Sequence, residues 1–277
     1  MKEIIRRGLR VFGIKTLSQL NAKLAKRERV FHAPPFTQEL VAAIKLVTPH
    51  FELTTSEKCR AFWEADQNGS CWGEYDALAP VFRSMPRPAK ILEIGPGLGR
   101  SLVFFSRKLG WENSEIDVYE GEGTITKNTV LGPRFDDSFC GNIKMLRHIL
   151  EYNNIRNVRI FNSRDTQMAE LPGPYHFIYS FYSVGFHWSL EHFLDDLLPL
   201  MDDKSVAVFT APTHFSPFPK MKDLAYSIVD YNPVWPENEK LTLLIIGKKS
   251  IPRLLPDFYL TIAKVYSFGF PINCLLE

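Results

Sequence analysis

The sequence has few cysteines, and they are scattered. The four are Cys59, Cys71, Cys140 and Cys274 in a chain of 277 residues. Their spacing excludes a dense disulfide framework and gives no zinc-binding pattern, so we expect a reducing, cytoplasmic location and no metal. Also lacking are an apolar run approaching the roughly 20 residues that cross a bilayer and the continuous apolar core of a signal peptide at the N-terminus.

The chain also lacks a strong net charge, but its charge is unevenly distributed. There are 33 Lys and Arg residues against 31 Asp and Glu, which gives +2. Residues 1–30 hold nine basic and two acidic residues, so the remainder is mildly acidic. An acidic core argues against a nucleic-acid groove. The basic segment alternates charged with apolar residues, which is typical of a helix packed on its own domain or a partner, or of peripheral contact with an anionic membrane.

Hydrophobic patterns divide the rest of the chain. We expect a basic arm and linker over residues 1–36 and a helical section over 37–88. From Lys90 onward, strand and helix patterns alternate, which indicates an α/β domain with a mostly parallel sheet over residues 89–249. Residues 250–277 are apolar and interrupted by prolines, and we expect a packed tail or an extra strand there. Strands are predicted at 90–94, 115–120, 158–162, 176–181, 205–210, 226–230 and 241–246.

A glycine-rich stretch follows the first of these strands. Glu93 and Ile94 lead into Gly95, Gly97 and Gly99, and a helical pattern starts at about residue 101. Glycine is required there because a residue without Cβ adopts positive φ freely and lets a ligand approach the backbone closely. The helix start also offers free N–H groups to an anionic part of a ligand. Arg100 occupies the position of the third glycine in the dinucleotide fingerprint, which argues against a nicotinamide enzyme.

This stretch, Glu-Ile-Gly-Pro-Gly-Leu-Gly, resembles the first motif of class I S-adenosylmethionine (SAM)-dependent methyltransferases. The resemblance implies a Rossmann-like sheet of seven strands with the last one reversed, and a helical N-terminal extension. It implies that an acidic residue closing the second strand holds the ribose hydroxyls and that one following the third strand reaches the adenine. The cofactor-binding residues expected on this basis are Glu93, Gly95, Pro96, Gly97, Gly99, Glu120, Gly121, Asp165, Thr166 and Ser180.

The segment from Tyr179 to Trp188 follows the fourth predicted strand and contains the catalytic candidate. A hydroxyl acceptor needs a base, and histidine is best suited to that role near neutral pH. His187 is therefore the predicted general base, although it could instead orient the loop. The pattern is similar to small-molecule O-methyltransferases, including plant and insect carboxyl methyltransferases, and the wider layout is similar to bacterial sugar O-methyltransferases. The expected substrate-contacting residues are Tyr75, Tyr182, Trp188 and His214.

About twenty residues, Gly121 to Gly141, separate the second strand from its helix, more than the family usually has. Because a long loop in a compact domain is usually functional or disordered, we expect a lid or substrate wall beside the cofactor ribose. Three functions stay open at this point. An O-methyltransferase of a small molecule or glycan is favoured, a carboxyl or amine methyltransferase is the first alternative, and a non-catalytic cofactor-binding partner subunit is the second. The oligomeric state is not predicted.

Overall fold

Seven apolar segments form one sheet in the computed structural model. The structure describes residues 34–47, 55–60, 87–122, 141–181, 183–184, 190–212, 219–231 and 241–249. The strand order is β3-β2-β1-β4-β5-β7-β6. β7 runs antiparallel to both of its neighbours, whereas the pairs from β3 to β5 are parallel. The strands are β1 (Lys90–Ile94), β2 (Glu115–Glu120), β3 (Val158–Asn162), β4 (Phe177–Ser180), β5 (Val206–Pro212), β6 (Ala225–Tyr231) and β7 (Leu241–Gly247).

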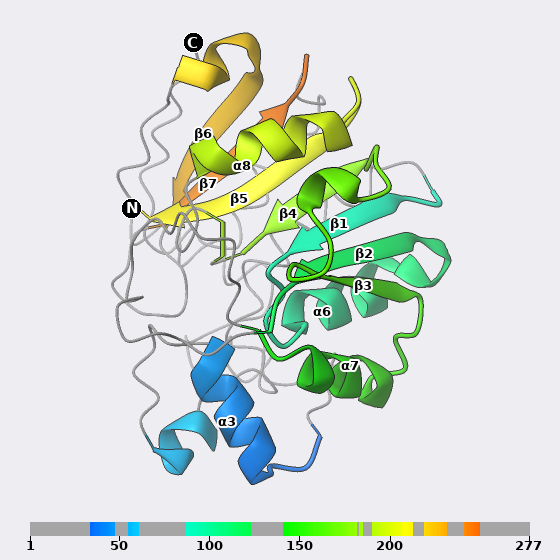
Figure 1. Cartoon of the computed structure of the whole chain (residues 1–277), viewed down its shortest axis with the longest axis vertical. Coiled ribbons are helices and arrows are strands. Elements are labelled where there is room, and N and C mark those ends of the chain that lie inside the picture. The colour runs from blue at the N-terminus through cyan, green and yellow to red at the C-terminus, as the bar shows by residue number, and fades with distance from the viewer. Residues whose placement is uncertain are drawn as a thin grey trace, which may run out of the picture.

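This is a Rossmann-like sheet with a reversed last strand. The predicted fold class is therefore confirmed, and β1, β2 and β3 have the predicted bounds. Within the described residues, α-helices and short 3-10 turns accompany the strands (Figure 1). The helices are α3 (Gln38–Val47), α6 (Arg100–Leu109), α7 (Ile143–Tyr152) and α8 (Leu190–Leu197), and the 3-10 turns are η2 (Trp111–Asn113), η3 (Met168–Glu170), η4 (Leu198–Leu200) and η5 (Pro219–Asp223).

Local sequence explains where the two helices nearest the glycines begin and end. α6 lies between Gly99 and Gly110, both in the left-handed region, and the Gly110 N–H closes its last turn on the Ser106 carbonyl. α7 starts after Asn142, whose side chain accepts a hydrogen bond from the Met145 N–H at 2.9 Å. Such a cap satisfies one of the free N–H groups of a helix start and stabilises it by about 1 kcal/mol.

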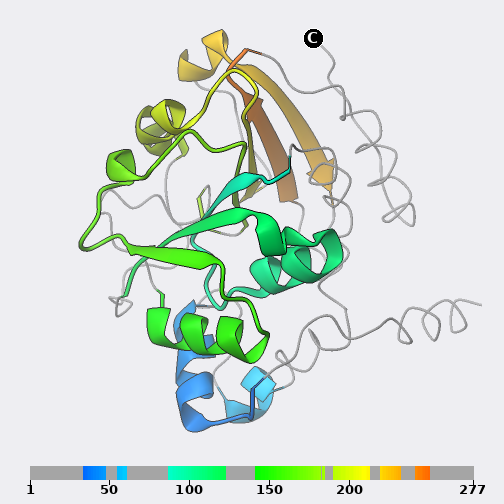
Figure 2. The same ribbon diagram turned by 90° about the vertical axis from the view of Figure 1, so that its right-hand side faces the viewer.

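Alternate residues of the strands point to two separate apolar layers. Ile91, Ile116 and Tyr179 belong to a cluster that also contains the buried faces of α3, α6 and α7. Leu92 and Ile178 belong to a second cluster, with α8 and the turns η3 and η4. Figure 2 shows α6 and α8 on opposite sides of the sheet. α3, from the helical section before the sheet, thus contributes to the same core as α6, α7 and the sheet.

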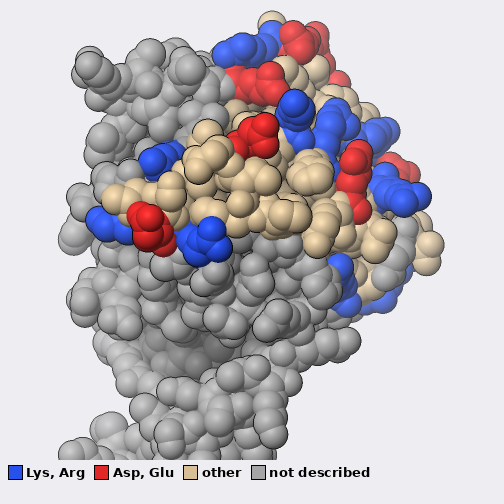
Figure 3. Space-filling model, turned by 90° about the horizontal axis from the view of Figure 1, so that it is seen from below, with Lys and Arg blue, Asp and Glu red and all other residues tan. Residues whose placement is uncertain are grey.

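The surface of the described residues is mixed in charge. Figure 3 shows Lys and Arg side chains interspersed with Asp and Glu on the face seen from below. None of the described helices is long and apolar enough to cross a membrane. The basic arm, residues 61–86, the insert from 123 to 140 and the tail from 250 onward lie outside the described residues.

Candidate functional site

The glycine loop is held in a conformation that other residues adopt rarely. Gly95, Gly97 and Gly99 have φ values of 65°, 59° and 73°. The Gly95 N–H donates to the Tyr119 carbonyl of β2 at 2.9 Å, and the Gly99 N–H donates to Pro96 at 3.0 Å. These bonds fold the chain tightly from β1 into α6 and keep Gly95 and Gly97 only half-buried. The three-glycine pattern therefore builds the turn that the sequence predicted.

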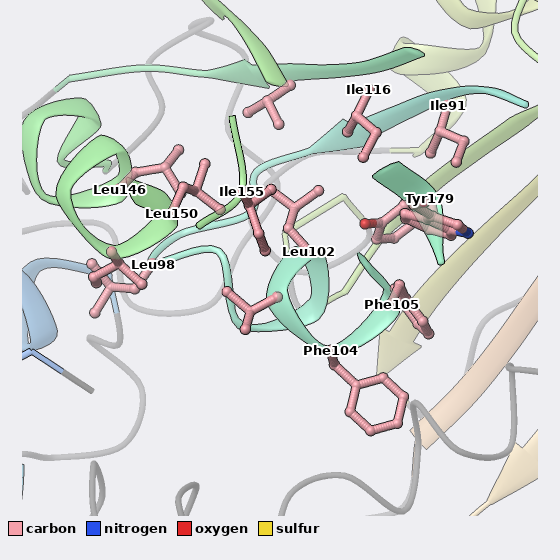
Figure 4. Close-up of a cluster of buried hydrophobic side chains, with 14 of the residues drawn as sticks. Ile91, Leu98, Leu102, Phe104, Phe105, Ile116, Leu146, Leu150, Ile155 and Tyr179 are labelled. Atoms are coloured by element: carbon pink, nitrogen blue, oxygen red, sulfur yellow. The ribbon is translucent and has the colours of Figure 1, made fainter. Parts of the chain in front are cut away.

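The far end of the loop packs against α7. Leu98 is 2% exposed and lies beside Leu146 and Leu150 (Figure 4). A Cβ added at Gly99 would come within 2.7 Å of Leu146 and 3.3 Å of Leu150. The third glycine is thus required both by its φ and by the close approach of α7.

Glu120, at the end of β2, contacts the loop directly. Its Oε2 accepts a hydrogen bond from the Gly97 N–H at 2.9 Å, and its Oε1 accepts one from the Gly121 N–H at 2.9 Å. Burial raises the pKa of this carboxyl to about 7, against the lowering effect of these two bonds. Each oxygen keeps a second lone pair for a hydroxyl donor.

Gly141 covers this carboxylate. The backbone of Glu122 bridges to Gly141, so the two ends of the insert lie side by side. A Cβ at position 141 would lie 2.6 Å from the carboxyl carbon of Glu120 and closer still to the Gly121 carbonyl oxygen. Glu120 is consequently only 3% exposed, although it lies at the sheet edge. This contact was not predictable from the sequence, because nothing local to Gly141 shows what it approaches.

Glu93, two residues before the first glycine of the loop, is buried. The residue is 1% exposed. Its Oε2 accepts from the Tyr179 hydroxyl at 2.8 Å, and its Oε1 accepts from the Ser101 hydroxyl. Burial raises its pKa to about 8; the two hydroxyls lower it and the charge of Glu120 raises it further. Glu93 therefore ties β1, β4 and the first turn of α6 together below the site.

Sequence reasoning did not assign Ser101 and Tyr179 to this site. Both are polar groups within apolar segments: Tyr179 in the Phe-Ile-Tyr-Ser strand and Ser101 at the start of α6. Their position within apolar segments could have indicated a buried hydrogen bond, because a polar group placed in a core normally has a hydrogen-bond partner there.

The remaining cofactor candidates lie at the same edge of the sheet. Asp165 and Thr166 follow β3, and their N–H groups donate to the Asn162 carbonyl at 3.0 Å each. The Asp165 side chain is exposed. The Thr166 carbonyl accepts from the Tyr119 hydroxyl at 3.1 Å, which anchors this turn to β2.

Ser180 ends β4 and is fully buried. Its hydroxyl accepts a hydrogen bond from the Val184 N–H at 3.1 Å, so it shapes the root of the loop that leads to His187. The structure thus gathers residues from the ends of β1, β2, β3 and β4, as a parallel sheet does at its carboxyl edge. His187, Tyr182, Trp188, Tyr75 and His214 lie outside the described residues.

Outside the glycine loop, two kinds of feature could hold a ligand: a metal-binding cluster and a hollow in the surface. Among the described residues, no three His, Cys, Asp or Glu side chains gather as a metal site. A hollow of about 360 Å³ lies beside β3 and α7, lined by Val158, Ile160, Leu150, Arg147 and Arg156 among others. It adjoins the start of the edge strand β3, and none of the glycine-loop residues lines it.

Comparisons with known proteins give distant likenesses only. No protein-family model and no curated protein sequence matches this chain. Among solved structures, precorrin-6y C5,15-methyltransferase from Geobacter metallireducens GS-15 is 14% identical, with 64% of this chain and 88% of that one covered and a TM-score of 0.40. A SAM-dependent methyltransferase from Aquifex aeolicus is 12% identical, with 64% and 93% covered and a TM-score of 0.42.

The plantazolicin methyltransferase BpumL in complex with SAH is also similar. It is 12% identical, with 76% of this chain and 97% of that one covered and a TM-score of 0.43. At such identities and TM-scores, these likenesses carry no argument about what this chain binds or does.

Proposed function

We propose that this chain is a SAM-dependent methyltransferase. The observation that carries the proposal is the Glu120 carboxylate, hydrogen-bonded to Gly97 of a left-handed glycine loop at the carboxyl edge of the sheet. A buried carboxylate with one free lone pair on each oxygen suits the two hydroxyls of a ribose. The half-buried backbone of Gly95 and Gly97 suits the close approach of a ligand.

The residues present fit SAM, provided that one contact opens. The glycine loop and Gly121 would line the methionine and ribose portions, Glu120 would accept the ribose hydroxyls, and Asp165 with Thr166 would lie near the adenine. Because Gly141 covers Glu120, we propose that the Glu122–Gly141 bridge separates when the ribose enters. This gives the insert the role of a lid, and a variant lacking residues 128–137 that keeps full activity would exclude that role.

We propose a hydroxyl of a small molecule or a sugar as the acceptor. The bound cofactor would supply an electrophilic methyl group, and the protein must align the acceptor oxygen with it and exclude water. His187 would take the proton of that oxygen, and Tyr75, Tyr182, Trp188 and His214 would contact the acceptor. The buried Ser180, which accepts the Val184 N–H, fixes the start of the loop that leads to His187.

Replacing His187 by Ala tests the acceptor class. Hydroxyl methylation should fall by about 10²–10⁴-fold, the usual effect of losing an acid–base group, while SAM affinity should stay unchanged. An unchanged rate would favour the carboxyl or amine alternative, since an ionised carboxylate needs only positioning. Tight SAM binding without product on any panel of glycans and small acids would favour the non-catalytic partner subunit.

The basic arm suggests a contact outside the site. We propose that residues 1–30 place the enzyme peripherally on an anionic membrane or against a partner protein, within the cytoplasm. Co-sedimentation of the full chain with vesicles containing phosphatidylserine, compared with a chain lacking residues 1–30, would separate these options. Vesicle binding that requires residues 1–30 and weakens at high salt would support contact with a membrane. Failure to bind nucleic acid even at low salt is expected as well.

A further inference from the structure

The glycine loop lies between two buried carboxyl groups. Glu93 is held below it and Glu120 beside it, and they are 1% and 3% exposed. The groups that face Glu93 are the hydroxyls of Tyr179 and Ser101 and the charge of Glu120. Those that contact Glu120 are the N–H groups of Gly97 and Gly121, and the Gly141 backbone lies against it.

Neither carboxyl has a cationic partner within the described part of the chain. The ion pairs there involve Glu115, Asp117, Asp195 and Asp203. Moving a charge out of water is expensive unless an opposite charge or several hydrogen bonds compensate it. Both carboxyls are anchored to the same short segment, Glu120 by the Gly97 N–H and Glu93 by the Ser101 hydroxyl. The charge of Glu120 disfavours the ionised form of Glu93, so we treat their ionisation as that of a pair.

Binding of SAM, the ligand of the proposed function, would change the protonation of Glu93 and Glu120. SAM carries a sulfonium and an ammonium group, and its ribose hydroxyls would donate to Glu120. Both features stabilise the ionised carboxylates over the neutral acids. The product cofactor, S-adenosylhomocysteine (SAH), keeps the ribose and the ammonium but has no charge on sulfur.

We infer that Glu93 and Glu120 act as one proton-releasing pair, which gives up to one proton to solvent when SAM occupies the glycine loop and less when SAH does. The inference rests on the proposed function and extends it. Glu93 is then a positioning residue, because its carboxyl is hydrogen-bonded to Ser101 and Tyr179 and acts through them and through the electrostatic field at the loop. Before binding, burial with few compensating charges favours the protonated pair, consistent with the raised pKa of both groups.

The direct test is calorimetric titration of the full chain with SAM and with SAH. Each titration is run at the same pH in phosphate and in Tris, whose ionisation enthalpies differ. Released protons are taken up by the buffer, so the difference in binding heat between the two buffers gives the number of protons released. At pH 7 we expect about 0.5–1 proton for SAM, fewer for SAH, and near zero for both at pH 9. SAH controls for the ligand's own ammonium group.

Two tyrosines give a matched pair of variants. Tyr179 donates to Glu93 at 2.8 Å, and Tyr175 donates to Asp117 at 2.7 Å, on the other face of the sheet. Tyr179→Phe removes a bond that favours the ionised form of Glu93, so the pH at which proton release ends should move upward. Tyr175→Phe should leave that pH unchanged. Should Tyr179→Phe fail to fold, Ser101→Ala removes the other hydroxyl and predicts the same direction of shift.

Glu93→Gln completes the test, because glutamine keeps the shape without a titratable proton. This variant should bind SAM and release less than half the wild-type number of protons at pH 7. SAM binding without any proton release in wild type, or equal release in Glu93→Gln, would overturn the inference while leaving the proposed function intact. Absence of SAM binding to the folded chain would overturn both.

Discussion

Asp117 and Glu120 lie three residues apart in β2 and are both buried, but among the residues that the structure describes only Asp117 has a counter-charge. Arg159 donates to its two oxygens at 2.7 and 2.9 Å, and the Tyr175 hydroxyl donates at 2.7 Å. Within the same described ranges, Glu120 accepts hydrogen bonds from two backbone N–H groups, each at 2.9 Å. Asp117, in the middle of the strand, is therefore compensated by the protein itself. Glu120, at the carboxyl edge of the sheet, is free to accept further hydrogen bonds from a ligand.

The largest expected effect comes from removing the unpaired charge. Glu120→Ala should weaken SAM binding by about 10²–10³-fold, because two hydrogen bonds to a charged group are lost. Calorimetric titration would measure the affinity. Asp117→Ala is the matched control, and its folded fraction should bind SAM as wild type does. Equal losses of affinity in the two variants would contradict the distinction between the two carboxylates.

The two variants should rank in the opposite order in their effect on stability. Asp117→Ala should lower the free energy of unfolding by about 2–4 kcal/mol, since it leaves the buried Tyr175 hydroxyl without its partner and opens a cavity. The half-exposed Arg159 can turn to water, which limits the loss. Glu120→Ala should cost less than about 1 kcal/mol, because it also removes a poorly compensated buried charge. Urea denaturation of both variants would show whether the order is as stated.

A pair of glycines sharpens the comparison further. Gly141→Ala should lower the free energy of unfolding by about 1–3 kcal/mol and strengthen SAM binding, because the added Cβ displaces the segment that covers Glu120 and so favours the open arrangement that the ribose needs. Gly173→Ala is the control, since its Cβ would come within 3.0 Å of Leu200, in the other apolar layer. It should cost stability without changing SAM affinity. Thermal unfolding with and without SAM separates the two effects, and a Gly173→Ala variant that loses SAM affinity would refute the distinction.

The smallest effect is a pH dependence. Glu93 ionises near pH 4.5 when unfolded and near pH 8 when folded, so the folded chain holds the proton more tightly. The resulting stability is fully present below about pH 4.5 and is lost as pH rises toward 8. Without SAM, wild type should lose on the order of 1–2 kcal/mol more than Glu93→Gln between pH 6 and pH 9. Urea denaturation at both pH values would measure this. An equal loss of unfolding free energy in wild type and in Glu93→Gln would contradict it.

The sequence predicted the sheet and the position of the site, because both follow from local patterns. Apolar runs predicted the bounds of β1, β2 and β3, and the three glycines predicted the turn into α6. The interactions within the site were not predictable in this way. Tyr179 is 86 residues from Glu93, and Gly141 is 21 residues beyond Glu120; only the folded chain brings them into contact. For the same reason the sequence did not show that Glu93 is buried and hydrogen-bonded to Ser101 and Tyr179.

The central claim is that the glycine loop and Glu120 form a SAM site. The most direct test is a titration of the folded full chain with SAM, followed by the amide signals of Gly97 and Gly121, whose N–H groups donate to Glu120. We predict saturable shifts of both signals with one common affinity, while the Gly173 signal stays in place. Unmoved Gly97 and Gly121 signals at saturating SAM, in a chain shown to be folded, would contradict the account.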